Sequence, residues 1–289
     1  MTATDDFEPT ARTYVSQGLT LNYLDWGNEG APILLLLHGN RDHARSWDWT
    51  ARALRRDWRV IAADLRGHGD SGWSPGGGYL TSYYVLDIAD LVDALGQDQL
   101  TIVGHSFGGN VVARYSAMRP DRVRKLALVE GLGPSSATRA EWAKLGPVQR
   151  TRDWIEKRRA VARPLRTMAT IDDAVARMSA ANPHLTPAQA RHLAVHGVRR
   201  NGEGYSWKYD PLVSVFPPEE FSTDNAAIWP QIACPTLLFY GAESWTGNPV
   251  TDGRVAHFRD PRAEVFEGAG HWLHHDQFDR FITALHAFL

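Results

Sequence analysis

Gly104-His105-Ser106-Phe107-Gly108-Gly109 is the stretch of sequence that decides the fold. It matches the pattern G-x-S-x-G and lies between an apolar segment, residues 100–104, that predicts a buried strand and a segment, residues 110–118, that predicts a helix. The small residues around Ser106 allow a sharp turn, so the serine is expected to stand clear of the sheet. The unpaired N–H groups at the start of the helix would face it. We therefore expect Ser106 to act as a nucleophile.

Strands and helices alternate on both sides of this turn. Residues 33–37 are five consecutive apolar residues, which is typical of a strand buried on both faces. Residues 12–26 predict an antiparallel edge hairpin around Gln17-Gly18. Further strands are expected at residues 58–63, 123–129, 235–240 and 263–266, and helices at 45–56, 81–95 (capped by Thr81 and stopped by Gly96) and 276–289. The alternation predicts an α/β fold: a mostly parallel sheet of about eight strands with helices on both faces.

The middle of the chain has a different pattern. Residues 133–225 contain no segment that predicts a strand, and helices are expected at 150–166, 171–181 and 187–197. We therefore predict a helical cap (133–225) inserted into an α/β core formed by residues 1–132 and 226–289.

Composition excludes several classes of protein. The chain of 289 residues is 43% hydrophobic and carries a net charge of −2, so no global field favours nucleic acid. The first ten residues, MTATDDFEPT, lack the basic and apolar regions of a secretory signal, and the apolar run 33–37 is far below the ~20 residues of a membrane span. The single cysteine, Cys234, is expected to pack in the core. We expect a cytoplasmic protein with no membrane or nucleic-acid partner. The sequence does not indicate an oligomeric state.

A serine hydroxyl needs a base to remove its proton before it attacks an ester. His271 is the best candidate, because it follows the last predicted strand in the glycine-rich segment Gly268-Ala269-Gly270-His271-Trp272. His274 and His275 are expected at the surface or at the entry of the last helix. No carboxylate or cysteine ligands accompany these histidines at metal-binding spacing, so we expect neither a metal nor a cofactor.

Two carboxylates are candidates for the acid that orients the histidine. Glu130 ends the strand 123–129, and Glu243 follows the strand 235–240. A carboxylate at the end of an apolar strand is costly unless it has a partner. Glu130 is therefore the preferred acid, and Glu243 remains the alternative.

These motifs resemble those of the α/β-hydrolase fold family over nearly the whole chain. His38-Gly39-Asn40 is similar to the family's oxyanion loop, and residues 64–71, DLRGHGDS, are similar to its loop after the neighbouring strand, where Asp64 is expected to bind backbone. The resemblance implies an oxyanion hole formed by the backbone N–H groups of Phe107 and Asn40. The Asn40 side chain would either contact substrate or stabilise its loop. The family's commoner acid position, three residues beyond the glycine, holds Ser244 in this sequence.

The motif His38-Gly39-Asn40 together with Glu130 is similar to the haloalkane dehalogenases. Dehalogenases and epoxide hydrolases of this fold use an aspartate where this sequence has Ser106. The resemblance therefore implies an esterase or lactonase rather than a dehalogenase.

The sequence thus predicts a serine hydrolase that cleaves a small-molecule ester or lactone through an acyl-enzyme on Ser106. Trp47, Trp245 and Trp272 are candidates for the substrate pocket. Two alternatives stay open. The same residues could hydrolyse a carbon–carbon bond or perform perhydrolysis, or the chain could be a binding protein for a small ligand with slow turnover.

Overall fold

The computed structural model describes residues 7–161, 167–221 and 225–289. Eight strands form one sheet in the order β1-β2-β4-β3-β5-β6-β9-β10. Strand β2 is antiparallel to both of its neighbours, and the remaining pairs are parallel. The strands are β1 (Thr10–Ser16), β2 (Leu19–Asp25), β3 (Ile33–Leu37), β4 (Arg59–Ala63), β5 (Leu100–His105), β6 (Val123–Val129), β9 (Thr236–Gly241) and β10 (Pro261–Phe266). The α/β sheet of eight strands is as predicted.

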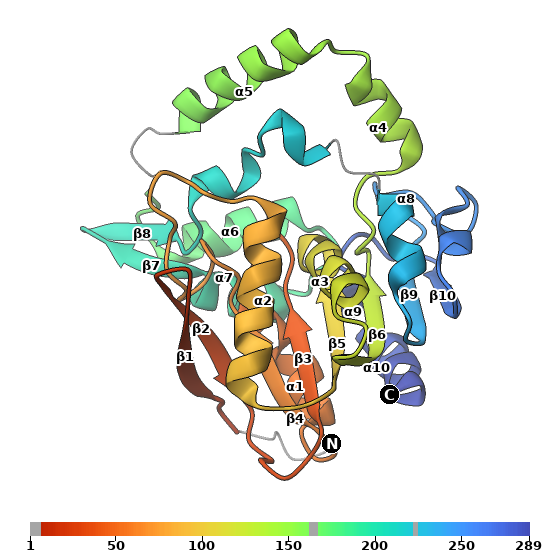
Figure 1. Ribbon diagram of the computed structural model, residues 1–289. Coiled ribbons are helices and arrows are strands. Elements are labelled where there is room, and N and C mark those ends of the chain that lie inside the picture. The colour runs from red at the N-terminus through yellow and green to blue at the C-terminus, as the bar shows by residue number, and fades with distance from the viewer. Residues whose placement is uncertain (1–6, 162–166, 222–224) are drawn as a thin grey trace.

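Helices cover both faces of this sheet (Figure 1). Helices α2 (Thr81–Leu95), α3 (Ser106–Met118) and α8 (Asn225–Ile228) lie on one face, and α1 (Asp48–Leu54) and α10 (Phe278–Phe288) on the other. Each face has its own apolar core, and β3 contributes alternate leucines to both, with Leu35 in one and Leu36 in the other. This two-sided burial explains why β3 is apolar at every position.

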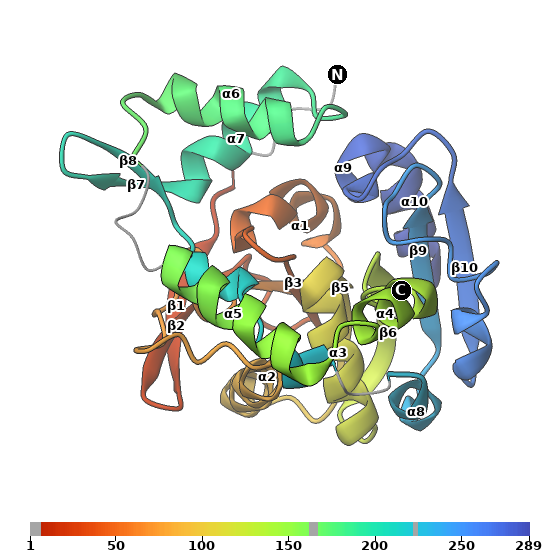
Figure 2. The same cartoon turned by 90° about the horizontal axis from the view of Figure 1, so that it is seen from above.

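The segment between β6 and α8 forms a separate layer of helices. Helices α4 (Ser136–Ala143) and α5 (Pro147–Val161) pass over the sheet at the carboxyl ends of its central strands, as Figures 1 and 2 show, and α6 (Ile171–Ala181) and α7 (Pro187–Gly197) pack on each other beside them. Helices α6 and α7 have the predicted bounds. Helix α4 was not predicted, and residues 162–166 of the predicted helix 150–166 lie outside the described residues.

The prediction that this segment has no strand is wrong. Strands β7 (Val198–Asn201) and β8 (Gly204–Trp207) form an antiparallel hairpin closed by the two-residue loop Gly202-Glu203. Gly202 has φ +63°, a conformation that glycine adopts without strain and that glycine-first hairpin turns require. Strands of four residues are too short to show a clear hydrophobic alternation. The glycine-containing turn was therefore the feature of the sequence from which this hairpin could have been predicted.

Several element ends differ from the prediction. Thr81 is the first residue of α2 and not its cap, since Leu80 holds the cap position without a side-chain hydrogen bond. Gly96 ends the same helix in the left-handed conformation, φ 69°, as predicted. The predicted C-terminal helix, 276–289, is α10, and a short helix that was not predicted, α9 (Leu273–Asp276), precedes it. Short 3-10 helices occur at η1 (Ala44–Trp47), η2 (Pro211–Ser214), η3 (Pro218–Phe221), η4 (Trp229–Gln231) and η5 (Arg254–His257).

Within the described residues, none of the helices combines the length and the hydropathy needed to cross a membrane.

Candidate active site

Ser106 lies at a tight turn between β5 and α3. Its φ of +52° is in the left-handed region, which costs a non-glycine residue about 1–2 kcal/mol. Close packing holds the turn in place: a Cβ added to Gly108 would lie 2.3 Å from the His38 carbonyl oxygen, and one added to Gly109 would lie 2.6 Å from Gly131 Cα. The turn therefore needs glycine at both positions, and it leaves the serine at the carboxyl edge of the sheet.

His271 contacts the serine directly. Its Nε2 lies 2.8 Å from Ser106 Oγ. Two hydrogen bonds fix the loop that carries the ring: His105 Nε2 donates to the His271 carbonyl over 3.0 Å, and the Gly270 N–H donates to Asp276 Oδ2 over 2.9 Å. His105 and Asp276 were not singled out from the sequence. His105 is the variable residue of G-x-S-x-G, so the motif gave no signal for this contact.

Glu130 is almost completely buried, at 1% exposure, behind His271. Its Oε2 lies 3.4 Å from His271 Nδ1, a charge contact that falls short of a well-formed hydrogen bond. The carboxylate also accepts hydrogen bonds from the Gly241 N–H over 2.7 Å, from Ser244 Oγ over 2.7 Å, and from Thr246 Oγ1. These donors replace the water that burial removes and hold the carboxylate in position at the ring.

Glu243, the alternative acid, lies elsewhere. Its side chain is 56% exposed, and Oε2 is 3.6 Å from Nε2 of His184, a partly exposed residue that precedes α7. The structure therefore brings Glu130, and not Glu243, to His271.

Phe107 and Asn40 flank the serine. Phe107 is the second residue of α3, so its N–H belongs to the first turn, where a helix provides no carbonyl partner. Asn40 follows β3, and both residues line the cavity described below. The Asn40 side chain stabilises its loop: Nδ2 donates to Ser214 Oγ over 3.0 Å, and Oδ1 lies 3.1 Å from His68 Nε2. Asp64 binds the backbone N–H groups of Ala44 and Asp70, as expected of a structural residue.

A cavity of about 750 Å³ opens beside the serine at the carboxyl ends of the parallel strands, where open α/β sheets bind their ligands. Trp245 and Trp272 line it, as predicted. Trp47 does not, and its assignment to the pocket is wrong. It is 0% exposed, lies within the core between α1 and the sheet, and stacks on His274 at 4.9 Å between ring centroids. The short helix η1 turns this side chain inward, which the sequence does not reveal.

His274 and His275 lie in α9, at the entry of the last helical segment, which is one of the two positions expected for them. Both are buried, so the alternative of a surface position is wrong. Burial lowers the pKa of His275 to about 3, and the nearby His192 adds to this effect. Burial likewise holds the pKa of His274 well below its usual range. Both rings are therefore neutral at pH 7 and behave as aromatic packing groups.

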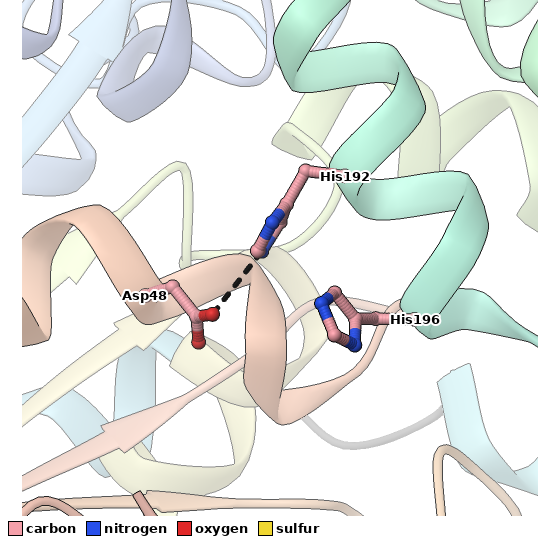
Figure 3. A group of neighbouring side chains, drawn as sticks. All are labelled: Asp48, His192 and His196. Carbon is pink, nitrogen blue, oxygen red and sulfur yellow. Dashed lines mark ion pairs between the residues drawn. The ribbon is translucent and has the colours of Figure 1, made fainter. Parts of the chain in front are cut away.

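One cluster of metal-type ligands occurs in the described part of the chain: Asp48, His192 and His196, drawn in Figure 3. Asp48 Oδ2 lies 3.2 Å from His192 Nε2 and accepts from Arg45 Nε over 2.7 Å. Arg52 Nη2 lies 3.9 Å from the same oxygen. A divalent cation bound here would be repelled by two guanidinium groups. We interpret the cluster as a polar contact between α1 and α7.

Comparisons with known proteins agree with this architecture. A sequence model of the alpha/beta hydrolase fold matches residues 32–278. The chain is 29% identical over 272 residues to Esterase Rv0045c of Mycobacterium tuberculosis (90% of this chain, 83% of the relative). It is 27% identical over 285 residues to Epoxide hydrolase 4 of Mus musculus (94% and 77%). A third match, 31% identical over 189 residues to a serine hydrolase-like protein of Danio rerio, covers 64% of this chain and only 57% of that relative.

Among solved structures, the thioesterase domain from the curacin biosynthetic pathway superimposes with a TM-score of 0.84 at 22% identity, covering 96% of this chain and 99% of that domain. Such a likeness concerns the fold alone. The relatives named above are all hydrolases by name. The family model matches most of the chain, and the sheet has the topology described above. The chain therefore belongs to the α/β-hydrolase fold family.

Proposed function

We propose that this hydrolase cleaves a carboxylic ester or lactone through an acyl-enzyme on Ser106. The observation that carries the proposal is the contact of 2.8 Å between Ser106 Oγ and His271 Nε2 at the wall of a large cavity. A hydroxyl and a base within hydrogen-bond distance form an activated nucleophile when a third group orients the base. Glu130 is in position to be that group.

The reaction would proceed in two halves. In the first, Ser106 Oγ attacks the ester carbonyl and gives its proton to His271 Nε2, and the backbone N–H groups of Phe107 and Asn40 stabilise the oxyanion. The carbon–oxygen bond then breaks, and His271 returns the proton to the departing alcohol. In the second half, His271 takes a proton from water, which attacks the acyl group. The bond from the acyl carbon to Ser106 Oγ then breaks, His271 returns the proton to Ser106 Oγ, and the acid is released.

The name of the mouse relative raises the alternative of epoxide opening. The residue at the turn argues against it, because by the resemblance described above epoxide hydrolases of this fold carry an aspartate there. A serine cannot form the ester intermediate that a carboxylate forms with an epoxide carbon. The esterase name of the mycobacterial relative agrees with the serine chemistry.

The segment 133–225 is proposed to be a cap that shapes the substrate pocket over a core of residues 1–132 and 226–289. Three of its residues, Trp142 of α4, Met178 of α6 and Phe216 of the loop between η2 and η3, line the cavity together with Trp245 and Trp272. An aromatic and apolar wall of this kind favours a small-molecule substrate with an apolar part.

The test is a substrate panel with the unmodified enzyme and the Ser106→Ala variant. The panel contains p-nitrophenyl esters of graded acyl length, lactones of several ring sizes and a vinylogous diketone, each followed to steady state. The proposal requires repeated turnover of at least one ester or lactone, lost in the variant. Turnover of the diketone alone would assign carbon–carbon bond hydrolysis, and binding without turnover would assign a ligand-binding role.

A further inference from the structure

Arg41 has an unusual backbone conformation beside the reacting groups. Its φ of +61° lies in the left-handed region, which residues other than glycine seldom adopt and which asparagine tolerates better than arginine. Arg41 directly follows Asn40, the proposed oxyanion residue. Gly39 of the same loop abuts the nucleophile, since a Cβ added to Gly39 would lie 3.1 Å from Ser106 Cβ. A strained conformation kept next to a reacting group points to a role for its side chain.

The Arg41 side chain lines the cavity together with Arg177 of α6 and with Tyr209, which follows β8. Both arginines are exposed, so a ligand in the cavity can reach their guanidinium groups. Burial raises the pKa of the Tyr209 hydroxyl, and the positive charge of Arg41 opposes this rise, with a smaller contribution from Arg177. The two cations therefore act on the same hydroxyl, and the three side chains form one arginine–tyrosine cluster.

This cluster carries positive charge and hydrogen-bond donors without a carboxylate partner. Among the described residues, neither Arg41 nor Arg177 forms an ion pair. Asp173, one turn before Arg177 on α6, instead accepts the Thr170 N–H over 3.0 Å. A cleft with unpaired charges of one sign attracts a ligand of the opposite sign, and a guanidinium group binds a carboxylate through two parallel N–H donors. The chemistry of the cluster therefore fits a carboxylate.

The order of the strands places the cluster on the acyl side of Ser106. Ser106 follows β5, whose neighbours in the sheet are β3 on one side and β6 on the other. Glu130 follows β6 and contacts His271, so the departing alcohol, which takes its proton from His271, lies towards β6. Arg41 comes after β3, on the opposite side. The acyl chain, which stays on the serine, can then extend towards Arg41.

We propose that the arginine–tyrosine cluster binds a free carboxylate at the far end of the substrate's acyl chain. The substrate is then a half-ester of a dicarboxylic acid. The loop after β3 supplies Arg41, and the segment 133–225 supplies Arg177 and Tyr209, so the bound carboxylate connects the two parts of the cavity wall. This assignment rests on the proposed ester hydrolysis and adds the charge of the acyl group and the residues that recognise it.

The test uses the mono-p-nitrophenyl esters of hexanedioic, octanedioic and decanedioic acid. Each is compared with the ester of the same length in which a carboxamide replaces the terminal carboxylate. The ratio of kcat/KM for the charged over the neutral ester should reach about tenfold for at least one chain length, between the effect of an exposed ion pair and that of a buried charge-assisted hydrogen bond. The ratio should fall in concentrated NaCl.

Variants locate the effect. Arg41→Asn, which suits the left-handed conformation, and Arg177→Gln, at an exposed helix position, should each lower the ratio at least threefold, mainly through KM of the charged ester. The double variant should bring it close to one. The neutral ester, measured with every variant, corrects for any change in the catalytic groups. The matched control is Arg159→Gln, which removes an exposed arginine of α5 paired with Glu156 at 3.3 Å and should leave the ratio unchanged.

A ratio below two at every chain length, or a ratio that the double variant retains, overturns the assignment. A second measurement separates this failure from that of the proposed ester hydrolysis. Calorimetric titration of Ser106→Ala with the same pairs gives Kd without turnover, and the charged ester should bind about tenfold more tightly than the neutral one. If none of the esters is hydrolysed by the unmodified enzyme, the proposed ester hydrolysis fails, and equal Kd values within each pair overturn the carboxylate site.

Discussion

Ser244 Oγ donates a hydrogen bond to Glu130 Oε2 over 2.7 Å. In the family pattern, the position of Ser244, after β9, commonly holds the acid itself. Here the carboxylate comes from the end of β6, the parallel neighbour of β9 in the sheet. Because the carboxyl ends of parallel neighbours meet at one edge, a residue after either strand reaches His271. Ser244, in the usual acid position, therefore donates a hydrogen bond to a carboxylate that the neighbouring strand supplies.

This arrangement predicts unequal effects of the two glutamates. Glu130→Gln should lower kcat by roughly 10³- to 10⁴-fold with little change in KM, because the lost charge matters most when the His271 ring is protonated in the transition state. Glu243→Gln, at the exposed site beside His184, should lower kcat less than about tenfold. Both are measured with folded protein at saturating ester. The opposite ranking would transfer the role of the acid to Glu243.

Removal of a hydrogen-bond donor to Glu130 should lower kcat less than the substitution of Glu130 itself. Ser244→Ala removes one of three hydrogen bonds to a buried carboxylate, and we expect about a tenfold loss of kcat, equal to roughly 1.4 kcal/mol. Ser244→Thr keeps a hydroxyl at this position and should retain most of the activity. Equal activity of the alanine variant and the unmodified enzyme would show that Gly241 and Thr246 hold the carboxylate without Ser244.

Buried histidines should make the protein labile in acid. Burial lowers the pKa of six of them: His38, His43, His68, His105, His274 and His275. Their folded pKa values lie below about 6.5, the value in the unfolded chain, so only the unfolded chain gains protons at first as the pH falls below 6.5. The stability present above pH 6.5 is then lost progressively towards pH 4, the approximate pKa of His43 and His68 in the fold. Asp42, whose pKa burial raises to about 7, acts in the opposite direction but is outnumbered.

Urea unfolding at pH 7 and pH 5 should therefore show a free energy of unfolding that is several kcal/mol lower at pH 5. His274→Leu should reduce the slope by up to about 1.4 kcal/mol per pH unit, since one proton fewer binds on unfolding. The exposed His286 gives the control, and His286→Gln should not change the slope. A stability that is independent of pH between 7 and 5 would contradict this interpretation.

The contact between α1 and α7 predicts an effect on stability. Asp48 is completely buried and meets Arg45 and His192, both about one-fifth exposed. Asp48→Asn should lower the free energy of unfolding by about 2–3 kcal/mol, less than the loss for a fully buried pair because its partners reach solvent. Asp57→Asn, at an exposed carboxylate 3.9 Å from His286, should change it by less than about 0.5 kcal/mol. Equal stabilities of the two variants would mean that the cluster contributes nothing.

Much of the sheet was predictable, because its strands carry the apolar runs that two-sided burial demands. The run 33–37 and the turn around Ser106 fixed the centre of the fold, and Glu130 was preferred on the cost of a buried charge. The hairpin β7–β8 was missed because four-residue strands have too little alternation. Trp47 was misplaced because only the path of η1 decides whether a tryptophan near the site faces the cavity or the core.

The charged lining of the cavity was not predictable at all. Arg114, Arg139 and Glu220 come from α3, α4 and η3, and no local pattern indicates that all three line one cavity. Their spacing in the sequence reflects the connections of the chain, whereas their spacing in the cavity depends on how the helices between β6 and α8 pack over the sheet.

The central claim, an acyl-enzyme on Ser106, is tested most directly by mass spectrometry of acid-quenched protein a few milliseconds after mixing with excess p-nitrophenyl octanoate. The account predicts an intact mass increased by one octanoyl group, located by peptide mapping to Ser106. The adduct should accumulate in Glu130→Gln if its hydrolysis is slowed more than its formation, and it should be absent in Ser106→Ala. Turnover of the ester by the unmodified enzyme with no adduct on Ser106, or with the acyl group on another residue, would contradict the account.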